Sequence, residues 1–191
     1  MSPIPFHPPL CALVVGHSKS DGGAVSASGA VREFDFNDAL ASDVADAVNA
    51  AKCGVKVMHR TNYTSLPAQI NAVKPDFVLE MHCNAYNGRA TGSEVLFWKT
   101  SSRGAVFAGI LQRRILEGLG LTDRGTKGIT GNDRGGFLLR RVLAPALICE
   151  PFFIDNPQDL RVAFERREFL VTAYARAIED IAGVIVRRPI K

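Results

Sequence analysis

Short apolar segments alternate with amphipathic ones along almost the whole chain. Segments of strand length, bounded by turn residues, lie at 11–15, 55–60, 76–82, 93–99, 137–141 and 146–150. Apolar residues at helical spacing predict helices over 33–52, 65–73, 102–118 and 158–184. The glycine-rich segments are predicted to be loops, at 16–30, 84–92 and 121–136.

Strands that alternate with helices favour one architecture. The order of the elements predicts an α/β fold of three layers, in which helices flank a mostly parallel central sheet. A chain of 191 residues is long enough for one domain with a full core, and no internal repeat or linker divides it. We therefore expect a single domain over residues 1–191, with its core at about 11–183.

The charge of the chain is basic and unevenly distributed. The formal net charge is +4, and nine lysines and arginines stand against three acidic residues between positions 99 and 141. This balance favours an anionic partner, such as a wall polymer, or an electrostatic contact with a membrane surface. An ordinary solvated face is the alternative interpretation of the stretch. No finger spacing, aromatic-basic repeat or RNP-like strand indicates binding to nucleic acid.

Nothing in the sequence has the pattern of a membrane anchor or an export signal. No apolar run reaches the roughly 18 residues of a membrane-spanning helix. The first 17 residues lack a basic leader and have prolines where an apolar signal core would lie. We therefore expect synthesis in the cytoplasm. Cys11 and Cys149 lie inside apolar runs and are expected to be small core residues.

Two histidines and two glutamates carry the candidate chemistry. His17 lies just beyond the first predicted strand, and His82 ends the third. Glu33 opens the first helix, and Glu150 ends the last strand. The carboxyl ends of parallel strands share one crevice. Two imidazoles and a carboxylate there would form a His₂Glu zinc site with its fourth position open, and a second, free carboxylate would serve hydrolysis as a general base.

Five motifs follow one another along the chain, and together they cover about residues 11–183. They are VVGHSKSDGGA, EFDFN, LEMHCNA, RGTKG and PALICEPFFIDNPQD. In this order they resemble the zinc-dependent N-acetylmuramoyl-L-alanine amidases of the Amidase_3 type. Each motif alone is short enough to occur by chance, but five in the right order, each at the expected end of a strand, are specific.

The resemblance implies a reaction, a cofactor and a set of site residues. The reaction is hydrolysis of the amide bond between the lactyl group of N-acetylmuramic acid and the L-alanine of the peptidoglycan stem peptide. By motif, His17, Glu33 and His82 match the family's zinc ligands. Glu150 matches its catalytic glutamate. Zinc is therefore the expected cofactor, and peptidoglycan is the expected partner.

The chain departs from the family at several positions. Ser18 and Lys19 stand where glycines usually follow the first histidine, and Pro151 follows the catalytic glutamate in place of a small or apolar residue. Glu80 replaces a small polar residue, and the alternation of a strand puts it on the same face as His82. We expect Glu80 to accept an imidazole N–H beside the metal; a surface carboxylate at the sheet margin is the alternative.

Each candidate also has a purely structural interpretation. Glu33 alone would stabilise a helix N-terminus, and His82 alone would be a half-buried histidine bonded to a carbonyl. Glu150 alone would pair with an arginine of residues 134–141. Asn84 is a candidate substrate contact, and the alternative is a side-chain hydrogen bond that fixes its own loop.

Two other functions stay open: the first keeps the fold without the catalysis, and the second keeps the same metal chemistry. One is a non-catalytic peptidoglycan-binding or regulatory module, which the four filled key positions disfavour. The other is a zinc peptidase that cleaves the stem peptide itself, which the masses of released fragments would distinguish from an amidase. The compact domain resembles a phage endolysin. Such an enzyme, expected here to be a monomer, is made in the cytoplasm and reaches the wall after a holin opens the membrane.

Overall fold

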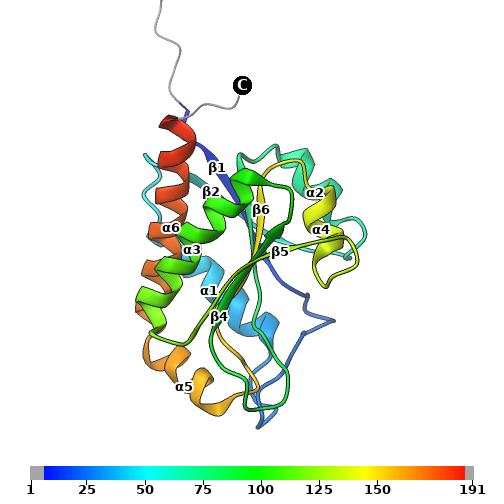
Figure 1. Cartoon of the computed structure of the whole chain (residues 1–191), viewed down its shortest axis with the longest axis vertical. Helices are drawn as coiled ribbons and strands as arrows, with labels where there is room; N and C mark the ends of the chain where they lie inside the picture. The colour runs from blue at the N-terminus through cyan, green and yellow to red at the C-terminus, as the bar shows by residue number, and fades with distance from the viewer. Residues whose placement is uncertain (1–6, 188–191) are drawn as a thin grey trace, which may run out of the picture.

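The computed structural model describes residues 7–187 and places one six-stranded sheet between two layers of helices (Figure 1). The strands are β1 (Leu10–Val15), β2 (Gly54–His59), β3 (Phe77–Met81), β4 (Ser93–Trp98), β5 (Asp123–Ile129) and β6 (Ala146–Glu150). The helices are α1 (Glu33–Ala47), α2 (Leu66–Val73), α3 (Ser102–Leu119), α4 (Gly136–Arg141), α5 (Pro157–Glu165) and α6 (Arg167–Arg187). The predicted α/β class and layered architecture are confirmed.

The strand order explains why the candidate residues come together. The order is β2-β1-β3-β6-β4-β5. The first four of these strands run parallel to one another, β4 is antiparallel to β6, and β5 is parallel to β4. The carboxyl ends of β1, β3 and β6 therefore meet at one edge, next to each other. The sheet is mostly parallel, as expected, and its reversed pair of strands lies at the far edge.

Both faces of the central strands are buried. Leu13 packs into the larger apolar cluster, with Leu40 of α1, Leu111 of α3 and Ile178 of α6. Its neighbour Val14 packs into the smaller cluster beneath α2 and α4. Figure 1 shows these two groups of helices on opposite sides of the sheet. Burial on both faces explains the continuous apolar runs, which are typical of parallel sheets.

No helix within residues 7–187 is long and apolar enough to cross a bilayer.

The predicted strand at 137–141 is wrong, because this segment is the short helix α4. In a strand, Leu138 and Leu139 would face opposite sides of the sheet. Here both are buried in the same apolar cluster, and the helical turn leaves Arg140 and Arg141 exposed. Gly135 adopts a left-handed conformation (φ 82°) and begins the turn, a geometry that glycine tolerates best.

Three other boundaries differ from the prediction. Residues 121–136 are predicted as a loop, yet they contain β5, an edge strand with mostly exposed side chains and no apolar alternation. The helix predicted to end at residue 52 ends at Ala47. The single helix predicted over 158–184 is two helices, which are separated at Arg166 (φ −109°, ψ 23°). The Arg166 guanidinium donates to the Gly118 carbonyl at the end of α3, a tertiary contact that a local pattern does not reveal.

Candidate metal centre

His17, Glu33 and His82 come from three segments and meet at the carboxyl edge of the sheet. His17 follows β1, His82 follows β3, and Glu33 is the first residue of α1. Val15 pairs with Met81 at the end of the β1–β3 ladder, and the Gly16 amide donates to the Met81 carbonyl at 2.9 Å. One ligand atom from each of the three residues lies within 4.8 Å of the others. The predicted trio is therefore assembled in the fold.

Glu33 is held as a fully buried carboxylate. It has no exposed surface, and its two oxygens accept hydrogen bonds from the backbone amides of Cys83 and Ala24, each at 2.9 Å. Burial alone would raise the pKa of Glu33, but the neighbouring imidazoles of His17 and His82 outweigh it and lower the pKa. Glu33 is thus an ionised, immobile acceptor for a cation.

The His17 ring is oriented by a second carboxylate on its outer side. Its Nε2 lies 3.2 Å from Glu33 Oε2, whereas its Nδ1 lies 3.4 Å from Asp21 Oδ2. Arg60 forms an ion pair with Asp21 and contacts His17 Nδ1. In the tautomer that a metal requires, Nδ1 carries the proton and donates it to Asp21, which leaves the Nε2 lone pair directed inward; Arg60 can donate to Nδ1 only in the other tautomer. His17 itself has a left-handed backbone (φ 66°), a strained conformation of the kind that gathers at functional sites.

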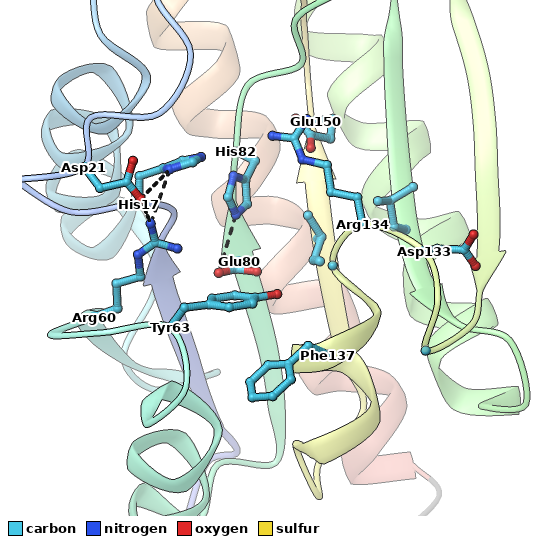
Figure 2. A pocket seen from close by; sticks show the side chains of 14 residues that line it. His17, Asp21, Arg60, Tyr63, Glu80, His82, Asp133, Arg134, Phe137 and Glu150 are labelled. Atoms are coloured by element: carbon cyan, nitrogen blue, oxygen red, sulfur yellow. Dashed lines mark hydrogen bonds and ion pairs between the residues drawn. The ribbon is translucent and has the colours of Figure 1, made fainter.

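His82 repeats this arrangement from the opposite side. Its Nδ1 is 2.8 Å from Glu33 Oε1, and its Nε2 is 3.4 Å from Glu80 Oε1. Figure 2 shows the Glu80 carboxylate at the outer edge of the His82 ring. Burial lowers the pKa of His82, but Glu80 and Glu33 outweigh it and raise the pKa. Glu80 is only 1% exposed, so the alternative of a surface carboxylate at the sheet margin is wrong.

The donors fit a zinc ion by their chemistry. Two imidazole nitrogens and a carboxylate oxygen are the ligands of His₂Glu zinc sites. Nε2 of His17 is buried and, among the described residues, has no hydrogen-bond partner, as a nitrogen reserved for a metal would be. The outer nitrogen of each ring faces a carboxylate, Asp21 or Glu80. Such outer carboxylates fix the tautomer and orientation of metal-binding histidines.

Glu150 lies beside this centre as an unpaired carboxylate. It ends β6, is 5% exposed, and lines the same pocket as His17 and His82. Its Oε2 is buried without a hydrogen-bond partner, and the structure from residue 7 to 187 gives it no ion pair. The alternative of a salt bridge to an arginine of 134–141 is therefore not formed. Burial is the main cause that raises the pKa of Glu150 to about 7.

The side chains of Asn84 and Cys83 contact other residues of the protein and do not line the pocket. The Asn84 amide donates to Glu94 at 2.9 Å, and its oxygen accepts from the Ala85 amide. Asn84 does not line the pocket of the metal centre, so these contacts match the loop-fixing interpretation. The buried Cys83 thiol lies near Asn37.

Several residues of the site are not anticipated by the sequence. A pocket of about 480 Å³ adjoins the trio. In addition to predicted residues, it is lined by others from distant segments, among them Asp21, Arg60, Tyr63, Asp133, Arg134 and Phe137 (Figure 2). The rings of Tyr63 and Phe137, 5.2 Å apart, form its aromatic wall. No local pattern marks these residues, because they come from the loops that follow β1 and β2 and from the segment that leads into and begins α4.

Two glycines pack against the ligands. A Cβ on Gly16 would lie 2.4 Å from the Met81 carbonyl oxygen and 2.7 Å from the His82 ring. A Cβ on Gly23, which has a φ of 72°, would lie 2.5 Å from both Glu33 Oε2 and the His17 ring. Both glycines lie in the first motif, VVGHSKSDGGA, but the sequence alone does not reveal this packing.

The comparison with known proteins identifies the fold and the family. The family model described as N-acetylmuramoyl-L-alanine amidase matches residues 11–180. An uncharacterised cell wall amidase of Bacillus anthracis is 30% identical over 94 residues, which are 45% of this chain and 17% of that protein. The chain thus spans less than a fifth of the length of this relative.

Solved structures share the fold over nearly the whole chain. Cwp6 from Clostridium difficile matches with a TM-score of 0.80 and 26% identity, over 91% of this chain and 29% of its own. The catalytic domain of an endolysin targeting the same species matches with a TM-score of 0.73 and 23% identity, over 96% of this chain and 99% of its own. With the family model matched from β1 into α6, the chain belongs to the N-acetylmuramoyl-L-alanine amidase family.

Proposed function

We propose that this chain is a zinc-dependent N-acetylmuramoyl-L-alanine amidase, which cleaves the amide bond between the lactyl group of N-acetylmuramic acid and the L-alanine of the stem peptide. Membership of the family supports the reaction. One observation carries the chemistry: three donors of the His₂Glu type lie within 4.8 Å of one another, and the unpaired carboxylate of Glu150 faces the same pocket.

The residues of the centre divide into those that hold the ion and those that orient the holders. His17, Glu33 and His82 would bind zinc, and Asp21 and Glu80 would keep the two rings in the required tautomer. A zinc ion bound there supplies Lewis acidity, which polarises the scissile carbonyl and activates water for attack. The hydrogen bonds that the Cys83 and Ala24 backbone amides donate to the Glu33 carboxylate limit its movement. The arrangement of the three ligands is therefore formed before substrate binds.

Glu150 would transfer the protons of the reaction. It accepts a proton from the attacking water as the new C–O bond forms. It then delivers this proton to the amide nitrogen as the C–N bond breaks, and the stem peptide leaves with a free L-alanine amine. Its position suits this role because its Oε2 has no competing partner among the described residues.

Fragment analysis tests the proposal directly. Purified peptidoglycan treated with the zinc-loaded protein should release intact stem peptides with a free alanine amine, which mass spectrometry identifies. Cleavage within the stem would indicate a peptidase, and no release by a folded, metal-loaded protein would indicate a non-catalytic module. Dialysis against a chelator should abolish release, and added zinc should restore it. Release that persists after complete metal removal would contradict the metal dependence.

Substitution of Glu150 tests its role separately from metal binding. Glu150→Gln keeps the shape of the side chain but removes the proton acceptor, so we expect turnover to fall roughly 100-fold or more. The zinc content should stay equal to that of the wild type, because Glu150 is not one of the three ligands. Undiminished hydrolysis by the metal-loaded variant would exclude Glu150 as the general base.

We propose host lysis as the biological setting, in agreement with the expected endolysin-like character. The fold serves an endolysin catalytic domain as well as Cwp6, so the setting is decided by experiment. Induced expression together with a pore-forming protein should lyse the cells, and expression of the Glu150→Gln variant should not. Equal lysis by both would contradict a lytic role for the amidase.

The predicted basic stretch does not form one surface. Arg113 and Arg114 lie on α3, whereas Arg140 and Arg141 lie on α4. These helices cover opposite faces of the sheet. The positive charge that could attract an anionic wall polymer or membrane is therefore distributed over both faces of the molecule. Such an attraction should weaken as the salt concentration rises.

A further inference from the structure

The basic side chains around the metal centre differ in whether an acidic partner neutralises them. Among the described residues, Arg60 and Arg134 are the basic ones that line the pocket. Arg124 and Lys127 lie on β5 nearby. A substrate anion would be bound most readily by a cation that has no partner within the protein.

Three of these four cations are already paired. Arg60 forms its ion pair with Asp21 and lies over the Tyr63 ring, 5.5 Å from the centroid. The two basic side chains of β5 share one acceptor, the nearly buried carboxylate of Glu94. Arg124 Nε and Lys127 Nζ lie 2.8 and 2.5 Å from its Oε2. Each of these three cations thus contacts a carboxylate of the protein, and the two carboxylates cancel two of the three charges.

Arg134 is different because its guanidinium has neither a hydrogen bond nor an ion pair with any residue in the range 7–187. Its loop is nevertheless well formed. Asp133 accepts hydrogen bonds from the amide and hydroxyl of Thr130, and Gly135 packs so closely that a Cβ would lie 2.4 Å from Ile148 of β6. Figure 2 shows Arg134 extending from this loop toward Glu150. The positive charge acts through space on Glu150, where it opposes the rise in pKa that burial causes, but the guanidinium donors have no hydrogen-bond partner among the described residues.

We propose that Arg134 binds the α-carboxylate of the second residue of the stem peptide, an inference that rests on the proposed amidase function. The two sides of the scissile bond differ in charge. On the sugar side, the lactyl carboxyl is consumed in the amide itself. On the peptide side, the first carboxylate belongs to the second residue, D-glutamate, which continues the stem through its side-chain carboxyl. Successive Cα atoms are 3.8 Å apart, so this carboxylate lies within one residue of the L-alanine whose nitrogen is released.

The chemistry of Arg134 matches that ligand. A guanidinium presents a planar set of donors that binds a carboxylate through two parallel hydrogen bonds. Arg134 is exposed at the pocket mouth, so a substrate carboxylate can reach its donors without displacing a protein partner. Many stem peptides carry an amide in place of this carboxylate, and Arg134 would discriminate against them because an amide has no charge.

A matched pair of substrates tests the inference. These are two muramoyl tripeptides, N-acetylmuramoyl-L-alanyl-γ-D-glutamyl-L-lysine and the same molecule with its glutamate α-carboxyl amidated. The wild type should cleave the acid with a kcat/KM roughly ten-fold above that of the amide. Arg134→Gln should remove this preference by lowering kcat/KM for the acid more than for the amide, chiefly through KM. Any change in kcat caused by the loss of a positive charge near Glu150 should be common to both substrates and cancel in the ratio. Arg134→Lys should retain part of the preference.

Arg140→Gln is the matched control, since Arg140 is an exposed arginine of the neighbouring helix that does not line this pocket; it should leave the preference unchanged. A preference that Arg134→Gln leaves unchanged, with kcat/KM lowered equally for both substrates or not lowered at all, would overturn the inference, as it would indicate at most a general role in the reaction or the loop. Failure of the folded, zinc-loaded wild type to cleave either tripeptide would instead refute the proposed function.

Discussion

Substituting Gly16 by alanine would show how closely β1 and β3 must approach to bring His17 and His82 together. The added Cβ would lie 2.4 Å from the Met81 carbonyl oxygen and 2.7 Å from Cε1 of His82. Carbon atoms pack at about 3.5–4 Å. The end of β1 and the His82 ring would therefore have to separate by about 1 Å.

This separation affects both stability and the metal centre. The Gly16 amide donates to the Met81 oxygen that the new methyl group would contact. Loss of that hydrogen bond costs about 1 kcal/mol, and the overpacking itself costs about 1–3 kcal/mol. We expect the free energy of unfolding to fall by about 2–4 kcal/mol. A shift of the His82 ring by about 1 Å should also reduce kcat/KM roughly 100-fold.

Urea unfolding of the metal-free protein measures the first effect, and hydrolysis of a muramoyl peptide measures the second. Gly109→Ala is the matched control, because Gly109 lies inside α3 and a Cβ added there would have nothing within 4 Å. This exchange should stabilise the protein by about 0.5–1 kcal/mol and leave hydrolysis unchanged. A Gly16→Ala protein with the stability and activity of the wild type would refute the argument that close strand approach creates the site.

Two further predictions concern buried carboxylates. Glu80→Gln removes the charge beside His82 Nε2 but keeps the shape, so zinc affinity should fall roughly ten-fold while the metal-free variant still folds. Competition with a chromogenic chelator measures this, and equal affinity would contradict it. Burial opposes ionisation of Glu94, but Lys127 and Arg124 outweigh it and lower its pKa. A lowered folded-state pKa adds stability above the ordinary pKa of glutamate and loses it as the pH falls. The excess stability of the wild type over Glu94→Gln in urea should thus be largest near neutral pH and vanish in acid; a difference independent of pH would count against this ion pair.

The parts of the fold that could be predicted are those in which burial determines the side chains. β1, β3 and β6 are buried on both faces and consist almost entirely of apolar residues, so their runs are visible in the sequence. β5 lies at the edge, and its backbone pairing with β4 requires no apolar pattern. The segment of α4 offers two adjacent leucines, which fit a strand as well as a helical turn until the neighbouring layer is known.

The residues of the site also divide into those that a local sequence pattern reveals and those that it does not. His17, Glu33, His82 and Glu150 could be predicted because each adjoins a predictable strand or helix and matches a motif. The residues that orient them come from elsewhere. Arg60 reaches Asp21 across 39 positions of sequence, and nothing local to either residue indicates the pair.

The two outer carboxylates do not support their histidines equally. The Asp21 side chain is 62% exposed, and Arg60 neutralises it, so solvent and the guanidinium screen its effect on His17. Glu80 is 1% exposed, its Oε1 makes no hydrogen bond within the described part of the chain, and it precedes His82 on the rigid end of β3. In such surroundings a charge acts with little screening. The orientation of His82 therefore depends on a buried charge fixed by the sheet, whereas that of His17 depends on the conformation of an exposed loop and on the strained backbone at its own position.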